Sequence, residues 1–182
     1  MGLEAIQTNA TSVAMRDPIR ARDAVIDPTG RYRYRLTRTW DPSLPVVVWI
    51  MLNPSTADAT QDDATIRRCT DFALRWYCGG IVVVNLFAFR STDPRELKRH
   101  ASLHIIGHEN DQHVLAACTA ENVRHIVAAW GNHGSMHTRD ISILRKLAEA
   151  HVIVECLGQT SSGLPKHPVR LAANTPLRPL IL

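Results

Sequence analysis

Four short apolar runs, separated by segments with helical periodicity, are the feature that most constrains the fold. They cover residues 46–52, 81–87, 123–131 and 151–158. The first of them, VVVWIML, is uninterrupted, which is typical of a strand that is buried on both faces of a parallel sheet. Because strands that alternate with helices indicate an α/β fold, we expect a three-layer domain. Its central sheet should be mostly parallel, with about four strands and helices on both faces.

The helices that connect these strands have recognisable starts and ends. Apolar positions recur at helical spacing after Asp62 and Asp63, and either carboxylate can cap the first turn. Gly79 and Gly80 would then end this helix. Two further helices are predicted, one within 103–120 and one over 137–150.

The N-terminal part of the chain differs from this pattern. Residues 24–40 contain a turn signal, DPTG, followed by apolar residues that alternate with arginines. This period of two predicts a β-hairpin at an edge of the sheet, with one face in water. We expect residues 1–23 to form a flexible arm and 24–182 to form one domain, whose Pro-rich tail holds no long regular element.

Composition limits the class of protein and its surroundings. The chain has 182 residues, of which 45% are hydrophobic and 21% charged, as in folded globular domains. Its longest apolar run is far shorter than the roughly 20 residues that span a membrane. No secretory signal is visible, and the four cysteines form no CxxC pair. We therefore expect a cytoplasmic protein without disulfides and without a membrane partner.

The basic residues favour a polyanionic partner. Lys and Arg total 21 against 17 Asp and Glu, which gives a net charge of +4. Most of the cations are arginines, whose planar guanidinium suits phosphate, so a nucleic acid or nucleotide is the expected partner. The alternative explanation is a genome that favours arginine codons. The sequence gives no indication of the oligomeric state.

Several common chemistries lack their motifs. The chain contains no GxxxxGK[ST], no GxGxxG and no GxSxG segment, which disfavours P-loop, Rossmann dinucleotide and α/β-hydrolase chemistry. The nine histidines follow no metal-ligand spacing that includes a nearby glutamate or cysteine pair. We expect neither a metal nor a cofactor. A metal-dependent hydrolase that uses these histidines remains an alternative.

Polar residues stand where the predicted strands end, which is where open α/β sheets bind ligands. Asn53 follows the first strand and Asn85 ends the second. Asparagine is depleted from strands, so these carboxamides are candidates for reading a polar ligand. For Asn53 the alternative is a turn-forming role before Pro54. Asn85 should be buried, and its amide then needs partners.

Two further candidates lie in loops. Asp58 precedes the predicted helix and could polarise a water molecule. His167 lies between Lys166 and Pro168 on a loop stiffened by prolines. From such a loop a histidine can donate a hydrogen bond to a developing anion. The alternative for this loop is simple packing over the sheet.

Five segments together resemble a known family: LNPSTADA, DDATIRR, NLFAFRSTDP, AAWG and LGQTSSGLPKHPVRL. They are similar to the bacterial and phage DUF1643 family, which is named for its unknown function. The similarity extends from about residue 24 to 180.

The layout also resembles the uracil-DNA glycosylase superfamily. LNPS follows the first strand, VVNLFAFRSTDP ends the second, AAWGNHG ends the third, and a late loop carries His167 and Pro168. The sequence departs from that superfamily in three respects. The first motif has no water-activating aspartate, the late loop lacks the longer form that wedges DNA, and no cysteine set for an iron–sulfur cluster is present.

The glycosylase resemblance implies a role for each matching residue. Asn53 would position a water molecule near the sugar C1′, Asn85 would read the Watson–Crick edge of a base, and His167 would stabilise the departing base anion. Phe87 or Phe89 would stack on the base. The cations expected to form a phosphate-binding rim are Arg67, Arg68, Arg90 and Lys166. The expected function is hydrolysis of an N-glycosidic bond in nucleic acid or a nucleotide. The alternative is a non-catalytic module that binds a nucleotide or single-stranded nucleic acid.

Overall fold

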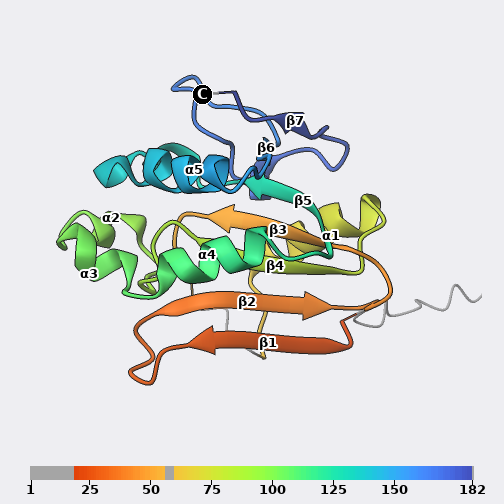
Figure 1. Ribbon diagram of the computed structural model, residues 1–182, viewed down its shortest axis with the longest axis horizontal. Helices are drawn as coiled ribbons and strands as arrows, with labels where there is room; N and C mark the ends of the chain where they lie inside the picture. Colours follow the sequence, from red (N-terminus) through yellow and green to blue (C-terminus); the bar gives the residue numbers. More distant parts are fainter. Residues whose placement is uncertain (1–18, 56–59, 182) are drawn as a thin grey trace, which may run out of the picture.

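One seven-stranded sheet organises the protein (Figure 1). The computed structural model describes residues 19–55 and 60–181. In chain order the strands are β1 (Ala21–Ile26), β2 (Arg33–Thr39), β3 (Val46–Met51), β4 (Gly80–Asn85), β5 (Val123–Ala128), β6 (Glu155–Cys156) and β7 (Arg178–Pro179). Their order across the sheet is β1-β2-β4-β3-β5-β6-β7.

The α/β class is confirmed, but the expected composition of the sheet is not. Strands β4, β3, β5 and β6 pair in parallel, whereas β1, β2 and β7 join by antiparallel pairing. The sheet therefore has more strands than the expected number of about four, and three of its seven strands join by antiparallel pairing. The expected hairpin is formed by β1 and β2; β2 pairs with β4, and β1 is the outermost strand on that side of the sheet. Since β1 begins at Ala21, the sheet starts before the end of the arm expected at 1–23.

The arginine-rich strand β2 lies inside the sheet rather than at its wet edge. Arg33 and Arg38 are 2% and 0% exposed. A buried charge needs a partner, and the Arg38 Nε donates to the Asp62 carboxylate at 2.7 Å. This ion pair allows an alternating Arg pattern, which usually indicates one solvated face, to occupy an internal strand.

Helices cover both faces of the sheet. Helix α1 (Ala64–Arg75) packs on the face that carries Val47 and Trp49 of β3. Helices α4 (Asn110–Cys118) and α5 (Arg139–Glu149) pack on the opposite face, against Val48 and Ile50. The continuous apolar run in β3 is explained by this burial on both sides.

Two predicted elements are shorter than expected. The helix predicted within 103–120 is divided into α3 (Ser102–Ile106) and α4, because Gly107 between them has φ +83°. A left-handed residue of this kind ends a helix. The fourth predicted strand is reduced to β6. The Pro-rich tail contains only the 3-10 helix η3 (Pro168–Arg170) and β7. None of the described helices has the length and apolar character needed to cross a bilayer.

Candidate functional site

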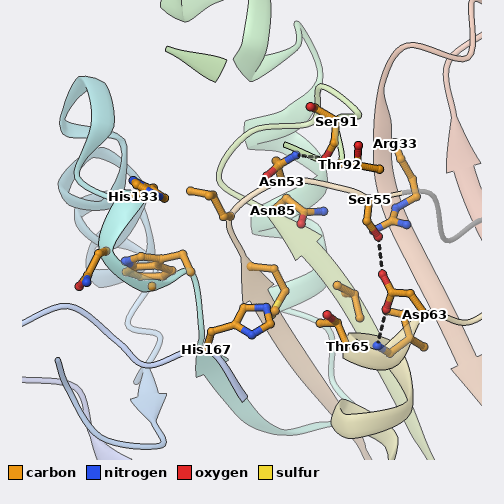
Figure 2. Close-up of a pocket in the computed structure, with 17 residues that line it drawn as sticks. Arg33, Asn53, Ser55, Asp63, Thr65, Asn85, Ser91, Thr92, His133 and His167 are labelled. Carbon is orange, nitrogen blue, oxygen red and sulfur yellow. Dashed lines mark hydrogen bonds between the residues drawn. The ribbon is translucent and has the colours of Figure 1, made fainter. Parts of the chain in front are cut away.

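A cavity of about 380 Å³ lies at the carboxyl ends of β3, β4 and β5. Asn53 follows β3, Asn85 ends β4, the segment Trp130–His133 follows β5, and His167 comes from the loop before η3. Figure 2 shows the two asparagines and His167 around one space, with Ser55 and Asp63 on its other side. The structure thus brings together the two asparagines that the strand-end argument singled out and the loop candidate His167. Their chemical roles stay predictions.

The buried carboxamide of Asn85 is the most unusual group in the cavity. The residue is 1% exposed, and neither its Oδ1 nor its Nδ2 has a hydrogen-bond partner among the described residues. Buried polar groups are nearly always paired, and an unpaired one costs about 1–3 kcal/mol. A ligand that presents a donor beside an acceptor would satisfy both atoms.

Main-chain bonding fixes the position of Asn85. It pairs in parallel register with Met51, and the Leu86 N–H donates to the Met51 carbonyl at 2.9 Å. From the helical side, the Asn110 side-chain amide donates to the Asn85 carbonyl at 2.9 Å and to the Leu86 carbonyl at 3.0 Å. Arg139 also donates to the Leu86 carbonyl, at 2.7 Å. The main chain at the end of β4 is therefore fixed, while the Asn85 carboxamide remains available to a ligand.

The His167 ring presents an N–H group to the cavity. Its Nδ1 accepts the main-chain N–H of Val169 at 3.4 Å as the cap of η3. An accepting Nδ1 carries no proton, so the neutral ring bears its proton on Nε2. The residue is exposed overall, and partial desolvation lowers the pKa of His167 below its ordinary value of 6.5, while the Asp63 carboxylate opposes that shift. Near pH 7 His167 is a neutral hydrogen-bond donor.

Asp63 combines a structural role with a place in the cavity wall. One carboxylate oxygen accepts the Ile66 N–H at 2.8 Å, which makes Asp63 rather than Asp62 the cap of α1. The other oxygen accepts the Ser55 hydroxyl. Asp63 is thus both the cap of α1 and a residue that lines the cavity.

Asn53 supports both interpretations given to it. Its Nδ2 donates to the carbonyls of Ser91, at 2.8 Å, and Pro54, at 3.1 Å. These bonds tie the loop after β3 to the loop after β4, as a turn-forming role requires. The Oδ1 of this half-buried side chain forms no hydrogen bond with the described residues and is free to orient a water molecule.

Other lining residues were not predicted. Arg33 belongs to β2 and reaches the cavity because β2 pairs with β4, a neighbour relation that sequence periodicity does not reveal. Trp130 forms part of the wall beside Gly134, where a Cβ atom would lie 1.9 Å from the indole ring. Asn132 and His133 follow β5, at the end of the third predicted strand, where the strand-end argument expects a ligand, although neither was a named site candidate.

Four of the predicted ligand-contacting residues lie elsewhere. Phe87 is fully buried in the core, which leaves no ring face for a base. Arg67 is exposed and donates to the Asp62 carbonyl at 2.6 Å. Arg68 donates to the Leu171 carbonyl and covers the Phe72 ring. Lys166 is exposed and does not line the cavity.

Arg90 lines an adjoining hollow. None of the four expected rim cations lines the cavity itself, and their binding of phosphate stays a prediction. Asp58 lies outside the described residues. Within residues 19–55 and 60–181, no three His, Cys, Asp or Glu side chains are grouped so that they could hold a metal ion.

One family model matches the chain, over residues 33–169, and its description is "Protein of unknown function (DUF1643)". No curated protein and no solved structure matches the chain. The matched segment covers three quarters of the chain and includes every residue that lines the cavity, from Arg33 to His167. The chain belongs to the DUF1643 family.

Proposed function

We propose that the cavity binds a nucleobase and that the protein hydrolyses its N-glycosidic bond, in nucleic acid or in a nucleotide. The observation that carries this proposal is the unpaired, buried carboxamide of Asn85. A carboxamide offers one acceptor and two donor hydrogens, which suits the adjacent donors and acceptors of a base edge. A volume of about 380 Å³ lies within the range of small-molecule sites.

His167 would assist the departure of the base. When the bond between C1′ and the base nitrogen breaks, its electron pair moves to the base, which leaves as an anion. The neutral His167 Nε2–H can donate a hydrogen bond to that anion. Donors aimed at developing charge are among the largest contributions to catalysis.

Asn53 would orient the attacking water. The free Oδ1 can accept a hydrogen bond from a water molecule whose oxygen adds to C1′. The proton that this water loses passes to solvent or to the departing base, which balances the hydrolysis. A base in a duplex would have to leave the stack to enter the cavity.

A non-catalytic binding module is the second candidate, and Asp63 favours it. Both oxygens of this carboxylate already accept hydrogen bonds, from the Ile66 N–H and the Ser55 hydroxyl. Asp63 is the one carboxylate among the described lining residues. Such a site has no unengaged carboxylate to take a proton from water, and it would recognise a base without cleaving its bond.

Base release from defined substrates tests both candidates. Oligonucleotides and nucleotides that carry uracil, hypoxanthine or other modified bases are incubated with the protein, and free base is separated chromatographically. Release that is lost in Asn85→Ala and His167→Ala, but retained in the exposed controls Asn174→Ala and His108→Ala, supports the hydrolase. Binding without release supports the module. Absence of both binding and release rejects the nucleobase site.

A further inference from the structure

A second hollow adjoins the cavity and extends it towards the turn between β1 and β2. Its volume is about 350 Å³, and it shares Ser55, Ser91 and Thr92 with the first cavity. Gly30, Arg90 and Glu96 complete its lining. The two hollows therefore adjoin each other along the shared residues.

Arg90 lines this hollow and Arg31 lies beside Arg90, and neither arginine has a carboxylate partner among the described residues. Arg90 donates to the Gly30 carbonyl at 3.2 Å, and its main-chain N–H bonds to the Arg31 carbonyl at 2.9 Å. The Arg31 guanidinium lies 2.9 Å from the His104 Nε2 and 5.9 Å from the centre of the Phe89 ring. Each guanidinium keeps N–H groups free for an anion.

Aromatic rings lie beside these arginines. The Phe89 ring centre is 5.3 Å from that of His100 and 5.6 Å from that of His104. Together with Arg31 and Arg90, these three rings form what we call the Arg31–Arg90 face. Figure 1 shows the β1–β2 turn, α2 (Pro94–Leu97) and α3 at the same end of the molecule, where these residues lie.

Nearby carboxylates are engaged locally. Asp27 accepts the Thr29 hydroxyl at 2.6 Å, Asp93 pairs with Arg95 at 3.0 Å, and Glu96 accepts the Ser91 hydroxyl at 2.5 Å. The turn after α2 adds two exposed cations, Lys98 and Arg99. Positive charge therefore exceeds negative charge around the Arg31–Arg90 face, and none of these three carboxylates is bound to Arg31 or Arg90.

We propose that the Arg31–Arg90 face binds the phosphodiester backbone of a single-stranded nucleic acid, one base of which enters the cavity. Proteins that bind single strands combine a cationic track with rings on which bases stack. Interactions with phosphate set the position of the strand, while a pocket reads the base. The substrate is then a polymer rather than a free nucleotide. The role of the base in this inference rests on the proposed function; the binding of the backbone does not.

Fluorescence anisotropy with a labelled single-stranded DNA of about 12 nucleotides tests the face. The double variant Arg31→Ala/Arg90→Ala should bind at least tenfold more weakly than the wild type at low salt. Its plot of log affinity against log salt should be less steep by about 0.7 for each phosphate that the variant no longer neutralises. The matched control Arg75→Ala/Arg145→Ala removes two exposed arginines elsewhere and should bind as the wild type does. The exposed pair Lys98→Ala/Arg99→Ala, whose side chains lie outside the core, should weaken binding in the same direction.

Each outcome decides the proposal. Equal weakening in the double variant and its control, or binding that does not respond to salt, overturns the Arg31–Arg90 face. Base release that is equally fast on a mononucleotide and unaffected by Arg31→Ala/Arg90→Ala also overturns the face, but leaves the proposed function intact. Salt-dependent binding that requires Arg31 and Arg90, without any base release, retains the face and removes the hydrolase.

Discussion

Asn110 donates its side-chain amide to the main-chain carbonyl of Asn85 across a distance of 2.9 Å, so one buried asparagine holds another. The two side chains differ in their hydrogen bonding, although the Asn110 Oδ1 is also without a partner among the described residues. The Asn110 Nδ2 forms two hydrogen bonds, whereas both polar atoms of the Asn85 side chain are without partners among the described residues. The Asn110 carboxamide stabilises the end of β4, whereas the Asn85 carboxamide lies at the cavity without a partner among the described residues.

This difference predicts opposite effects of the same substitution. Asn85→Leu removes two unpaired polar atoms at similar volume, so the free energy of unfolding should stay level or rise by about 1 kcal/mol. Asn110→Leu removes the hydrogen bond to the Asn85 carbonyl, so the free energy of unfolding should fall by about 1–3 kcal/mol. Urea denaturation of both variants measures the contrast. Asn122→Leu, at an exposed turn position, is the control. A marked loss of stability in Asn85→Leu would show that its amide is paired.

The lowered pKa of His167 predicts a pH-dependent loss of stability. Burial disfavours the charged ring in the folded protein, whereas the unfolded chain takes up the proton near pH 6.5. The unfolded state binds more protons in this window, so the free energy of unfolding falls as the pH drops below 6.5 and levels off below the folded pKa. His167→Gln should remove that part of the decline, as measured by urea denaturation at several pH values. If His167→Gln declines as the wild type does, the ring is not desolvated. His108→Gln, at an exposed position, is the control.

Asp63 and His167 are coupled through their charges, which gives a third prediction. The Asp63 carboxylate raises the pKa of His167 against the effect of burial. Asp63→Asn keeps an acceptor for the cap of α1 but removes the charge, so the pKa of His167 should fall further. An NMR titration of the ring measures this shift. Asp71→Asn, at an exposed position of the same helix, is the control. An unchanged His167 titration in Asp63→Asn would rule out the coupling.

A glycine beside the cavity wall gives a fourth prediction. A Cβ atom at Gly134 would lie 1.9 Å from the Trp130 ring, so Gly134→Ala must displace the indole and should cost about 1–3 kcal/mol of stability. Intrinsic tryptophan fluorescence and urea denaturation together would detect both effects. Gly163→Ala meets nothing within 4 Å, although its φ of +77° strains an alanine. The control should therefore lose about 1 kcal/mol without a spectral change at Trp130.

The sequence predicts those parts of the site that depend on where a strand ends. Asn53 and Asn85 could be proposed because parallel strands end at one edge of a sheet and ligands collect there, whereas His167 was a candidate because of its proline-stiffened loop. Arg33 could not, since its contribution depends on β2 lying beside β4, which periodicity does not specify. For the same reason the hairpin at an edge of the sheet was predicted, whereas the internal position of β2, between β1 and β4, was not. Whether the Phe87 side chain lies in the core or at the cavity depends on which side of the chain faces the core after β4 ends. No local sequence pattern indicates that side.

The family match begins at Arg33 and ends at Val169, which leaves out both outermost strands of the sheet, β1 and β7. A chain cut down to the matched segment would keep every lining residue of the cavity but expose the whole length of β2 along one border. Seven residues of unpaired main chain form a template for adding strands from other molecules. The N-terminal strand therefore protects a sheet that would otherwise self-associate, and purified protein that lacks β1 should aggregate even though its cavity is complete.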